Sequence, residues 1–167
     1  DCYYRAFVVM DGLRAKPATL FVQAGLNDLG QTTNRFGAGP NRWVLSKSNY
    51  FHWMTNLLVV AQTNNLPVIL THIWPYHSGA VSYPEIMTNR DDWNSYMDAV
   101  GAAYTNVLAV LDVGSYIGQY APLGPPGNYW DQKTGLDPGD GVHWTTTGYS
   151  NMAWGIYTEL ASAIRAT

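Results

Sequence analysis

Apolar residues are grouped along the chain in blocks of two lengths. Three short blocks are largely apolar over the length of a strand, and glycine or proline follows each of them within two residues. A strand without alternating polar residues is typical of a parallel sheet that helices cover on both faces. The pattern therefore predicts the α/β class, with parallel strands at about Thr19 to Gln23, Val68 to Ile73 and Val107 to Val113.

Longer blocks carry apolar residues at spacings of three and four, which predicts amphipathic helices. Pro17 ends the first helix, because the residue before a proline avoids the helical region. The helices are expected at about Ala6 to Lys16, from a cap at Ser46 or Ser48 to Asn65, at Trp93 to Tyr104, and from Thr147 onward. The expected apolar face of the second helix is Phe51, Met54, Leu57, Leu58 and Ala61, and that of the last is Ala153, Ile156, Tyr157, Leu160 and Ile164.

Three segments without apolar periodicity are predicted to be loops: Gly25 to Arg42, Trp74 to Arg90 and Gly114 to Gly139. Each of them follows a predicted strand. Ligands of parallel α/β sheets bind beyond the carboxyl ends of the strands. The chemistry of this protein is therefore expected just after Gln23, Ile73 and Val113.

The composition fits one packed domain, which we take to span residues 1–167. Of the 167 residues, 47% are hydrophobic and 13% are charged. The net charge of -3 gives no electrostatic basis for binding nucleic acid or an anionic membrane. No apolar run approaches the roughly 20 residues that a membrane span needs. The single cysteine, Cys2, has no partner for an internal disulfide.

Two tetrapeptides contain side chains that nucleophilic catalysis uses. Gly25-Leu26-Asn27-Asp28 follows the first predicted strand, and Asp140-Gly141-Val142-His143 precedes the last predicted helix. Either one alone is common turn or capping chemistry. Their order, their separation by two helices and two strands, and the stretch from Thr147 to Ala153 together resemble the SGNH/GDSL-type hydrolase family, in its third and fifth sequence blocks and its last helix. The resemblance covers nearly the whole chain and begins after that family's Gly-Asp-Ser block.

The resemblance implies an esterase in which His143 is the general base, Asp140 orients its ring and Asn27 donates to the oxyanion. The residues suit these roles, because the start of the following helix favours the neutral imidazole that accepts a serine proton. Asp140 can reach that ring across a glycine-containing turn. Gly25 lets the backbone approach the site, and Asp28 is expected to organise the loop by accepting backbone hydrogen bonds. Neither a metal nor an organic cofactor is expected.

The resemblance places the serine nucleophile upstream of residue 1. In the family's flavodoxin-like strand order, 2-1-3-4-5, the first strand lies beside the one that ends at Gln23. The domain is therefore expected to be N-terminally incomplete. Its open apolar edge at Leu20 to Val22 would need a covering segment from the same or another chain. Ser115 and Ser78 also follow predicted strands, but the family places no nucleophile there.

The other histidines carry weaker indications of function. His72 and His77 lie on either side of Trp74-Pro75 and would indicate a metal site only with a third ligand at suitable spacing, which we do not find. We interpret them as a core histidine and a loop histidine, and His52 as a structural residue of its helix.

Aromatic residues suggest a substrate class. The chain has 7 Trp and 12 Tyr, and flat rings stack on sugar faces. Trp43, Trp74, Trp130 and Trp144 are expected near the site, with Trp74 and Trp144 binding substrate. We expect an esterase that removes acyl groups, commonly acetyl, from a carbohydrate or other small ester, with a secreted or extracellular location favoured. The alternative is a non-catalytic binding or structural module of a larger surface or fibre assembly, which the missing serine favours.

Overall fold

The computed structural model describes residues 19–30, 32–37, 39–74, 83–122, 128–132, 135–136 and 143–165. The helix expected at Ala6 to Lys16 lies outside these residues. Within them, no helix combines the length and the apolar character that crossing a membrane requires.

Three parallel strands form the central sheet, in the order β1-β2-β3. They are β1 (Leu20–Val22), β2 (Val68–Thr71) and β3 (Val107–Leu111), each within the range expected from the sequence. The predicted parallel α/β sheet is therefore confirmed. The strands end one or two residues early, because the chain turns toward the loops at their carboxyl ends.

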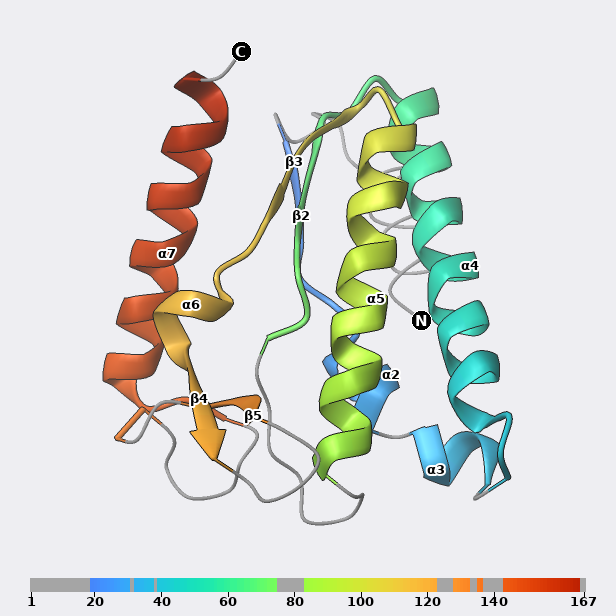
Figure 1. Ribbon diagram of the computed structural model, residues 1–167. Helices are drawn as coiled ribbons and strands as arrows, with labels where there is room; N and C mark the ends of the chain where they lie inside the picture. Colours follow the sequence, from blue (N-terminus) through green and yellow to red (C-terminus); the bar gives the residue numbers. More distant parts are fainter. Residues whose placement is uncertain are drawn as a thin grey trace.

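Helices cover the sheet in two unequal layers (Figure 1). On one face lie α4 (Arg42–Thr63) and α5 (Tyr83–Ala103), and on the other lies α7 (Thr146–Arg165). The strands separate two apolar clusters, one against α4 and α5 and one against α7. The arrangement is the expected three-layer α/β/α sandwich.

The larger cluster lies under α4 and α5. All five residues of the expected apolar face of α4 are buried, which confirms that face. Trp93 of α5 is fully buried and stacks on Tyr50 of α4, with ring centroids 5.3 Å apart and planes 18° from parallel. Val22, Val68 and Leu70 extend this cluster from the strands. This larger cluster therefore joins α4 and α5 to the face of the sheet beneath them.

The buried face of α7 differs from the expected one. Met152 is buried, and Ile156 and Leu160 pack against the same cluster, but Ala153 and Tyr157 are exposed. Gly155 permits close approach on this side, because a Cβ there would lie 2.7 Å from the ring of Tyr116. The apolar stripe in the sequence of α7 therefore coincides only in part, at Ile156 and Leu160, with the side that packs against the sheet.

The segment expected to be a loop from Gly25 to Arg42 contains two short helices, α2 (Leu26–Gly30) and α3 (Thr32–Phe36). Helix α4 begins at Arg42, earlier than the expected caps at Ser46 or Ser48. Ser46 lies within the helix and is buried, and its hydroxyl donates to the Asp28 carbonyl at 3.1 Å. The serine thus joins α4 to α2 and does not cap a helix.

The other two expected loops also contain regular structure. Helix α5 begins at Tyr83 and not at Trp93, because the polar stretch from Thr88 to Asp92 interrupts its apolar residues and hides the periodic pattern. After β3 come α6 (Gly114–Ile117) and a hairpin of β4 (Gly118–Pro122) and β5 (Asn128–Gln132). The hairpin is antiparallel and forms a separate sheet held by backbone pairing, which apolar periodicity does not reveal.

Candidate functional site

A pocket of about 330 Å³ lies where β1 leads into α2. The same end of the sheet carries the first turn of α7 (Figure 1). The pocket brings together six of the seven site residues expected from the sequence. Its described lining is Gln23, Ala24, Gly25, Leu26, Asn27, Asp28, Trp74, His143, Trp144 and Tyr149. Chain segments more than 100 residues apart in the sequence therefore meet at the carboxyl edge of the sheet.

Gly25 forms the turn between β1 and α2. Its φ of +100° is a conformation that residues with a side chain rarely adopt. A Cβ at this position would also lie 2.7 Å from Cδ1 of Ile73 and 3.0 Å from the ring of Tyr50. Both the backbone angle and the neighbouring side chains therefore require glycine, and this close packing fixes the direction of the residues that follow.

Ile73, which lies against Gly25, is held in place by α5. The Ile73 backbone N–H donates to Oδ1 of Asn94 at 2.8 Å, and Nδ2 of Asn94 donates back to the Ile73 carbonyl at 3.1 Å. Asn94 thus pairs with the end of β2 as a neighbouring strand would. The pocket wall beneath Gly25 is therefore rigidly attached to the helical layer.

Asn27 lies in the first turn of α2 and is exposed at the pocket. Leu29, two residues later, is fully buried and anchors this short helix in the core. The Asp28 carbonyl accepts hydrogen bonds from the hydroxyls of Thr32 and Ser46, at 3.0 and 3.1 Å. These contacts hold the backbone beside Asn27, so the side-chain amide of Asn27 is attached to a backbone segment that is fixed in place.

Asp28 has an organising contact with α3. Its Oδ1 accepts a hydrogen bond from Nη1 of Arg35 at 2.6 Å, in an ion pair whose carboxylate is 29% exposed. We expected the carboxylate to accept backbone hydrogen bonds, and its partner in the structure is a guanidinium. The pair connects α2 to α3 and leaves Asn27 as the polar side chain of α2 that is exposed at the pocket.

His143 is exposed at the pocket, three residues before α7 begins at Thr146. It therefore shares one cavity with Asn27, as the two motifs predict. Asp140 lies outside the described residues, so the hydrogen bond from the His143 ring to Asp140 stays a prediction.

Aromatic rings form part of the pocket wall. Trp144 is only 6% exposed and belongs mainly to the apolar cluster under α7, whereas Trp74 is half-buried. Tyr149, in the first turn of α7, is 51% exposed and lines the pocket, although we did not single it out from the sequence. Its position six residues after His143 was the available indication. Trp43 is 8% exposed in the core cluster and is not among the described lining residues, and the side chain of Trp130 lies outside the described residues.

Among the described residues, the other nucleophile candidate gives no alternative in this pocket. Ser115 is exposed in α6 and is not among the described lining residues. Ser78 and His77 lie outside the described residues. No group of three histidine, cysteine or acidic residues in the described ranges is placed to hold a metal ion.

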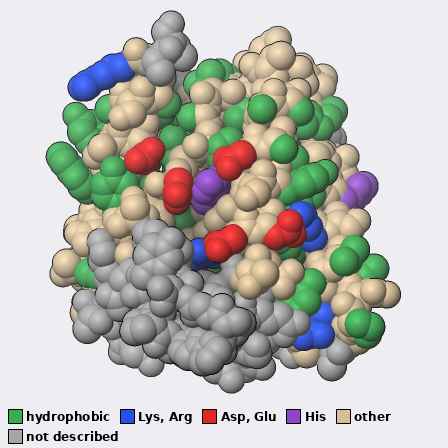
Figure 2. Space-filling view, viewed as in Figure 1, with side chains coloured by type: hydrophobic (Ala, Val, Ile, Leu, Met, Phe, Trp, Pro, Cys, Tyr) green, Lys and Arg blue, Asp and Glu red, His purple; other side chains and the backbone are tan. Residues whose placement is uncertain are grey.

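His72 lies beside two carboxylates and not within an apolar core. Its Nε2 is 2.8 Å from Oδ1 of Asp98 on α5, and its Nδ1 is 3.7 Å from Oδ1 of Asp112 after β3. Figure 2 shows acidic side chains gathered around a histidine in the middle of one face. Burial lowers the pKa of His72, but Asp112 and Asp98 together outweigh burial and raise it. His72 in turn lowers the pKa of Asp112 against the effect of burial. The interpretation as a core histidine is therefore corrected to that of an ionic bridge between α5 and β3.

This bridge predicts a pH-dependent contribution to stability. Because the folded pKa of His72 is raised, its contribution is fully present below the unfolded value of 6.5 and is lost as the pH rises through the folded pKa. His72→Gln should therefore lower the free energy of unfolding more at about pH 5.5 than at about pH 8.5 in urea titrations. Asp98→Asn should reduce the same pH dependence. Equal losses at both pH values would contradict the ionic bridge.

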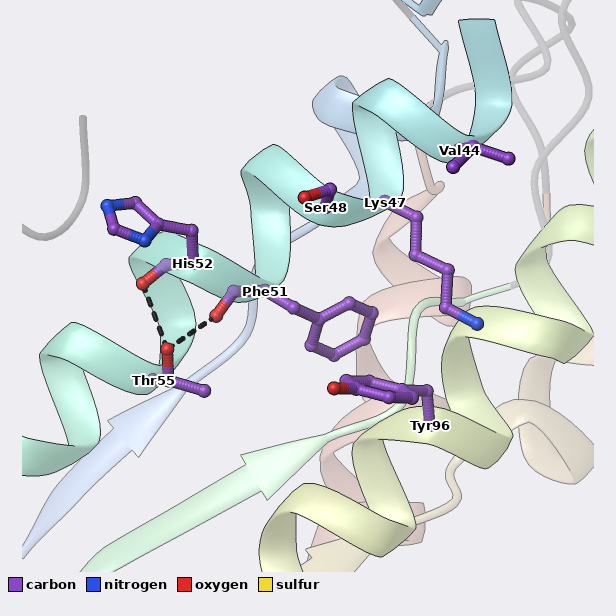
Figure 3. Close-up of a pocket in the computed structure, with 7 residues that line it drawn as sticks. All are labelled: Val44, Lys47, Ser48, Phe51, His52, Thr55 and Tyr96. Atoms are coloured by element: carbon purple, nitrogen blue, oxygen red, sulfur yellow. Dashed lines mark hydrogen bonds between the residues drawn. The ribbon is translucent and has the colours of Figure 1, made fainter. Parts of the chain in front are cut away.

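A second pocket, of about 460 Å³, lies between α4 and α5 (Figure 3). Lys47 already pairs with Asp92 at 2.7 Å and lies over the ring of Tyr96. The Thr55 hydroxyl donates to the carbonyls of Phe51 and His52. Lys47 and Thr55 are thus engaged by neighbouring groups of the two helices, and the described lining of this pocket lacks the combination of base and amide donor found in the first pocket.

Solved structures with a similar chain path show the fold of this chain. A candidate acylhydrolase from Bacteroides fragilis superimposes with a TM-score of 0.69 at 21% identity, covering 96% of this chain and 68% of its own. A GDSL-like lipase from Bacteroides thetaiotaomicron gives a TM-score of 0.62 at 19% identity, covering 90% of this chain and 64% of its own. The chain has the SGNH/GDSL-type hydrolase fold.

A third structure with lower similarity is described as a candidate platelet activating factor from Streptococcus pneumoniae. It gives a TM-score of 0.50 at 14% identity, over 93% of this chain and 89% of its own. No protein-family model and no curated protein sequence matches the chain. The first two structures show the SGNH/GDSL fold, and about a third of each of them lies outside the matched part.

Proposed function

We propose that this chain forms the larger part of a serine esterase, a carboxylic ester hydrolase of the SGNH type. The observation that carries the proposal is that Asn27 and His143, from opposite ends of the chain, line one pocket at the carboxyl edge of a parallel sheet. The descriptions of two structural matches, a candidate acylhydrolase and a GDSL-like lipase, support an ester bond as the target.

The proposed chemistry assigns one step to each polar group. The neutral His143 imidazole takes the proton of a serine hydroxyl as that oxygen attacks the ester carbonyl, and Asp140 holds the ring in the required orientation. The Asn27 amide donates to the oxyanion that forms. His143 then gives its proton to the departing alcohol. In the second half of the reaction His143 takes a proton from the water that attacks the acyl-serine, and gives it to the serine oxygen as the carboxylic acid leaves. No metal or organic cofactor takes part.

The nucleophile is proposed to come from a segment that precedes Asp1. Among the described residues that line the pocket, the phenol of Tyr149 is the only hydroxyl, and no thiol is present. In the described part of the chain, β1 forms the edge of the sheet, and pairs only with β2. A further parallel strand beside β1 would end next to Asn27 and could present a serine there.

The proposed substrate is an acylated carbohydrate, most simply an acetyl ester of a sugar. The support is the aromatic surface of the pocket, where Trp74 and Tyr149 offer accessible ring area and the buried Trp144 also lines the wall. Flat rings pack well against the apolar faces of sugars. The described pocket presents one acidic side chain, Asp28, which is engaged with Arg35, so an uncharged substrate fits it best.

Asn27→Ala tests the oxyanion role. In the complete protein, loss of one oxyanion donor is expected to lower kcat for 4-nitrophenyl acetate by about 100- to 1,000-fold, with a much smaller change in KM. Asn56→Ala is the matched control, because Asn56 lies on α4 and its side chain contacts only His52 among the described hydrogen bonds. A fall of less than threefold for Asn27→Ala, or an equal fall for the control, would remove Asn27 from the mechanism.

A second candidate function is a non-catalytic module that binds acylated carbohydrate without cleaving it. The absence of a serine, threonine or cysteine from the described pocket lining favours it. The complete protein would then bind acetylated oligosaccharides in calorimetry but would release no acetate from them. Acetate release at an enzymatic rate excludes this candidate.

A further inference from the structure

Asn94 joins α5 to the end of β2 without lining the pocket. Its carboxamide accepts a hydrogen bond from the Ile73 backbone N–H at 2.8 Å and donates one to the Ile73 carbonyl at 3.1 Å. Asn94 is half-buried and is not among the described residues that line the pocket. An effect of Asn94 on a ligand in the pocket would therefore act through Ile73.

Gly25 lies against two side chains, and two consecutive residues of α5 support both of them. A Cβ at Gly25 would lie 2.7 Å from Cδ1 of Ile73 and 3.0 Å from the ring of Tyr50. Asn94 holds the backbone of Ile73, and Trp93 stacks on Tyr50 with ring centroids 5.3 Å apart. Because packed side chains of this kind leave no free space, α5 fixes the place of Gly25.

The backbone of Gly25 in turn begins α2. The Gly25 carbonyl accepts a hydrogen bond from the Leu29 N–H at 2.9 Å, and Asn27 lies inside the turn that this bond closes. A helix of five residues has too few internal hydrogen bonds to hold its own direction, so its attachments decide where it lies. A shift of Ile73 would therefore be passed through Gly25 to Asn27.

The residue before Ile73 is held by the same side of α5. Nε2 of His72 lies 2.8 Å from Oδ1 of Asp98, which is four residues after Asn94 and so on the same side of the helix. Trp74, directly after Ile73, lines the pocket. The segment 72–74 is thus attached to α5 by two side chains one turn apart, immediately before it reaches the pocket.

We propose that Asn94 is a positioning residue of the reaction: by holding Ile73 against Gly25, it sets the place of Asn27, the donor to the oxyanion. The inference rests on the proposed function and deepens it. It gives a role in the reaction to α5, which contributes no residue to the described lining of the pocket.

Steady-state kinetics of the complete protein test the effect on Asn27. Asn94→Ala should lower kcat for 4-nitrophenyl acetate at least about tenfold and change KM by less than about twofold, because misplacing a reacting group by about 1 Å can cost about 100-fold in rate. In an Asn27→Ala background the same substitution should lower kcat by less than about twofold, since the donor that it positions is gone. A general loss of structure would lower kcat equally in both backgrounds.

Asn106→Ala is the matched control. Asn106 is also half-buried, and its Nδ2 donates to the carbonyls of Leu58 and Leu66, at 3.4 and 3.2 Å, directly before β3 at the amino end of the sheet. Its loss removes comparable hydrogen bonds at the end of the sheet away from the pocket. The control should lower the free energy of unfolding and leave kcat unchanged.

Hydrogen exchange of the native protein gives a readout that needs no substrate. The Leu29 amide should exchange at least about tenfold faster in Asn94→Ala, and at the unchanged rate in Asn106→Ala, because only the first substitution frees the start of α2. Asn94→Asp keeps the oxygen that accepts from Ile73, and it takes the place of Asn94→Ala should that variant not fold, with the same expected pattern.

Three results would overturn the inference: an unchanged kcat in Asn94→Ala, equal falls in kcat in both backgrounds, or an unchanged exchange rate at Leu29. Each of them leaves the proposed function standing when the unchanged protein hydrolyses the ester and Asn27→Ala impairs it. Absence of ester hydrolysis by the unchanged protein would instead remove the proposed function. The exchange rate at Leu29 would then decide by itself whether Asn94 holds α2.

Discussion

His143→Ala is expected to lower kcat/KM for 4-nitrophenyl acetate at least about 1,000-fold in the complete protein, because the serine hydroxyl loses its proton acceptor. The free energy of unfolding should change little, since His143 is exposed and precedes α7 without lying in its core. Steady-state kinetics and urea unfolding of the same preparation measure the two quantities.

His52→Ala is the matched control for this substitution. His52 is an exposed histidine on α4, where its ring contacts Asn56, and it lies in the other pocket. The control should retain full activity. Activity of the His143 variant above a tenth of that of the unchanged protein would exclude His143 as the general base.

Gly25→Ala is expected to destabilise the protein by about 3 kcal/mol, combining the cost of a positive φ with that of crowding in a packed core. The new methyl group would meet the side chain of Ile73, whose backbone Asn94 holds, so the neighbours cannot simply move apart. Displacement of α2 would move Asn27, so kcat should fall as well. Urea unfolding and steady-state kinetics check both effects.

Gly37→Ala separates the two contributions. Gly37 also has a positive φ, of +72°, but a Cβ there would meet nothing within 4 Å. Only the cost of the positive φ applies, so the free energy of unfolding is expected to fall by about 1 kcal/mol, and activity should be retained. Similar losses at both positions would show that the contact with Ile73 does not constrain the site.

The strands were the most predictable part of the fold. A parallel strand is apolar on both faces, and the three short apolar blocks are visible without any knowledge of their partners. The buried face of α4 was equally clear, because it packs in one cluster with the strands and α5.

Elements that lack a one-sided apolar pattern could not be predicted. Short α2 and α3 are held by hydroxyls such as Ser46, whose polar type suggested a helix cap. Helix α5 continues through the polar stretch from Thr88 to Asp92 and begins at Tyr83, and the hairpin of β4 and β5 depends on backbone pairing. For α7, the apolar stripe of the sequence includes the exposed side at Tyr157 as well as the buried side, so periodicity alone placed the centre of the buried face wrongly.

The site was predictable where residue type and position in the chain coincide. Asn27 and His143 each adjoin a strand or helix end that the sequence marks, and their meeting follows from the parallel sheet. Tyr149 was missed because a tyrosine on a helix has no distinguishing pattern of its own, and its position six residues after His143 was the one indication in the sequence. Trp43 was selected although it belongs to the core, because tryptophan serves cores and binding surfaces equally.

The most direct test of the account is to label the complete protein with a fluorophosphonate, which reacts with serines that an adjacent base activates. Peptide mass spectrometry then locates the adduct. The account predicts a single labelled serine in the segment that precedes Asp1, with labelling lost in His143→Ala and retained in His52→Ala. A label on Ser115 or on any other serine within residues 1–167, or ester hydrolysis without any labelled serine, would contradict it.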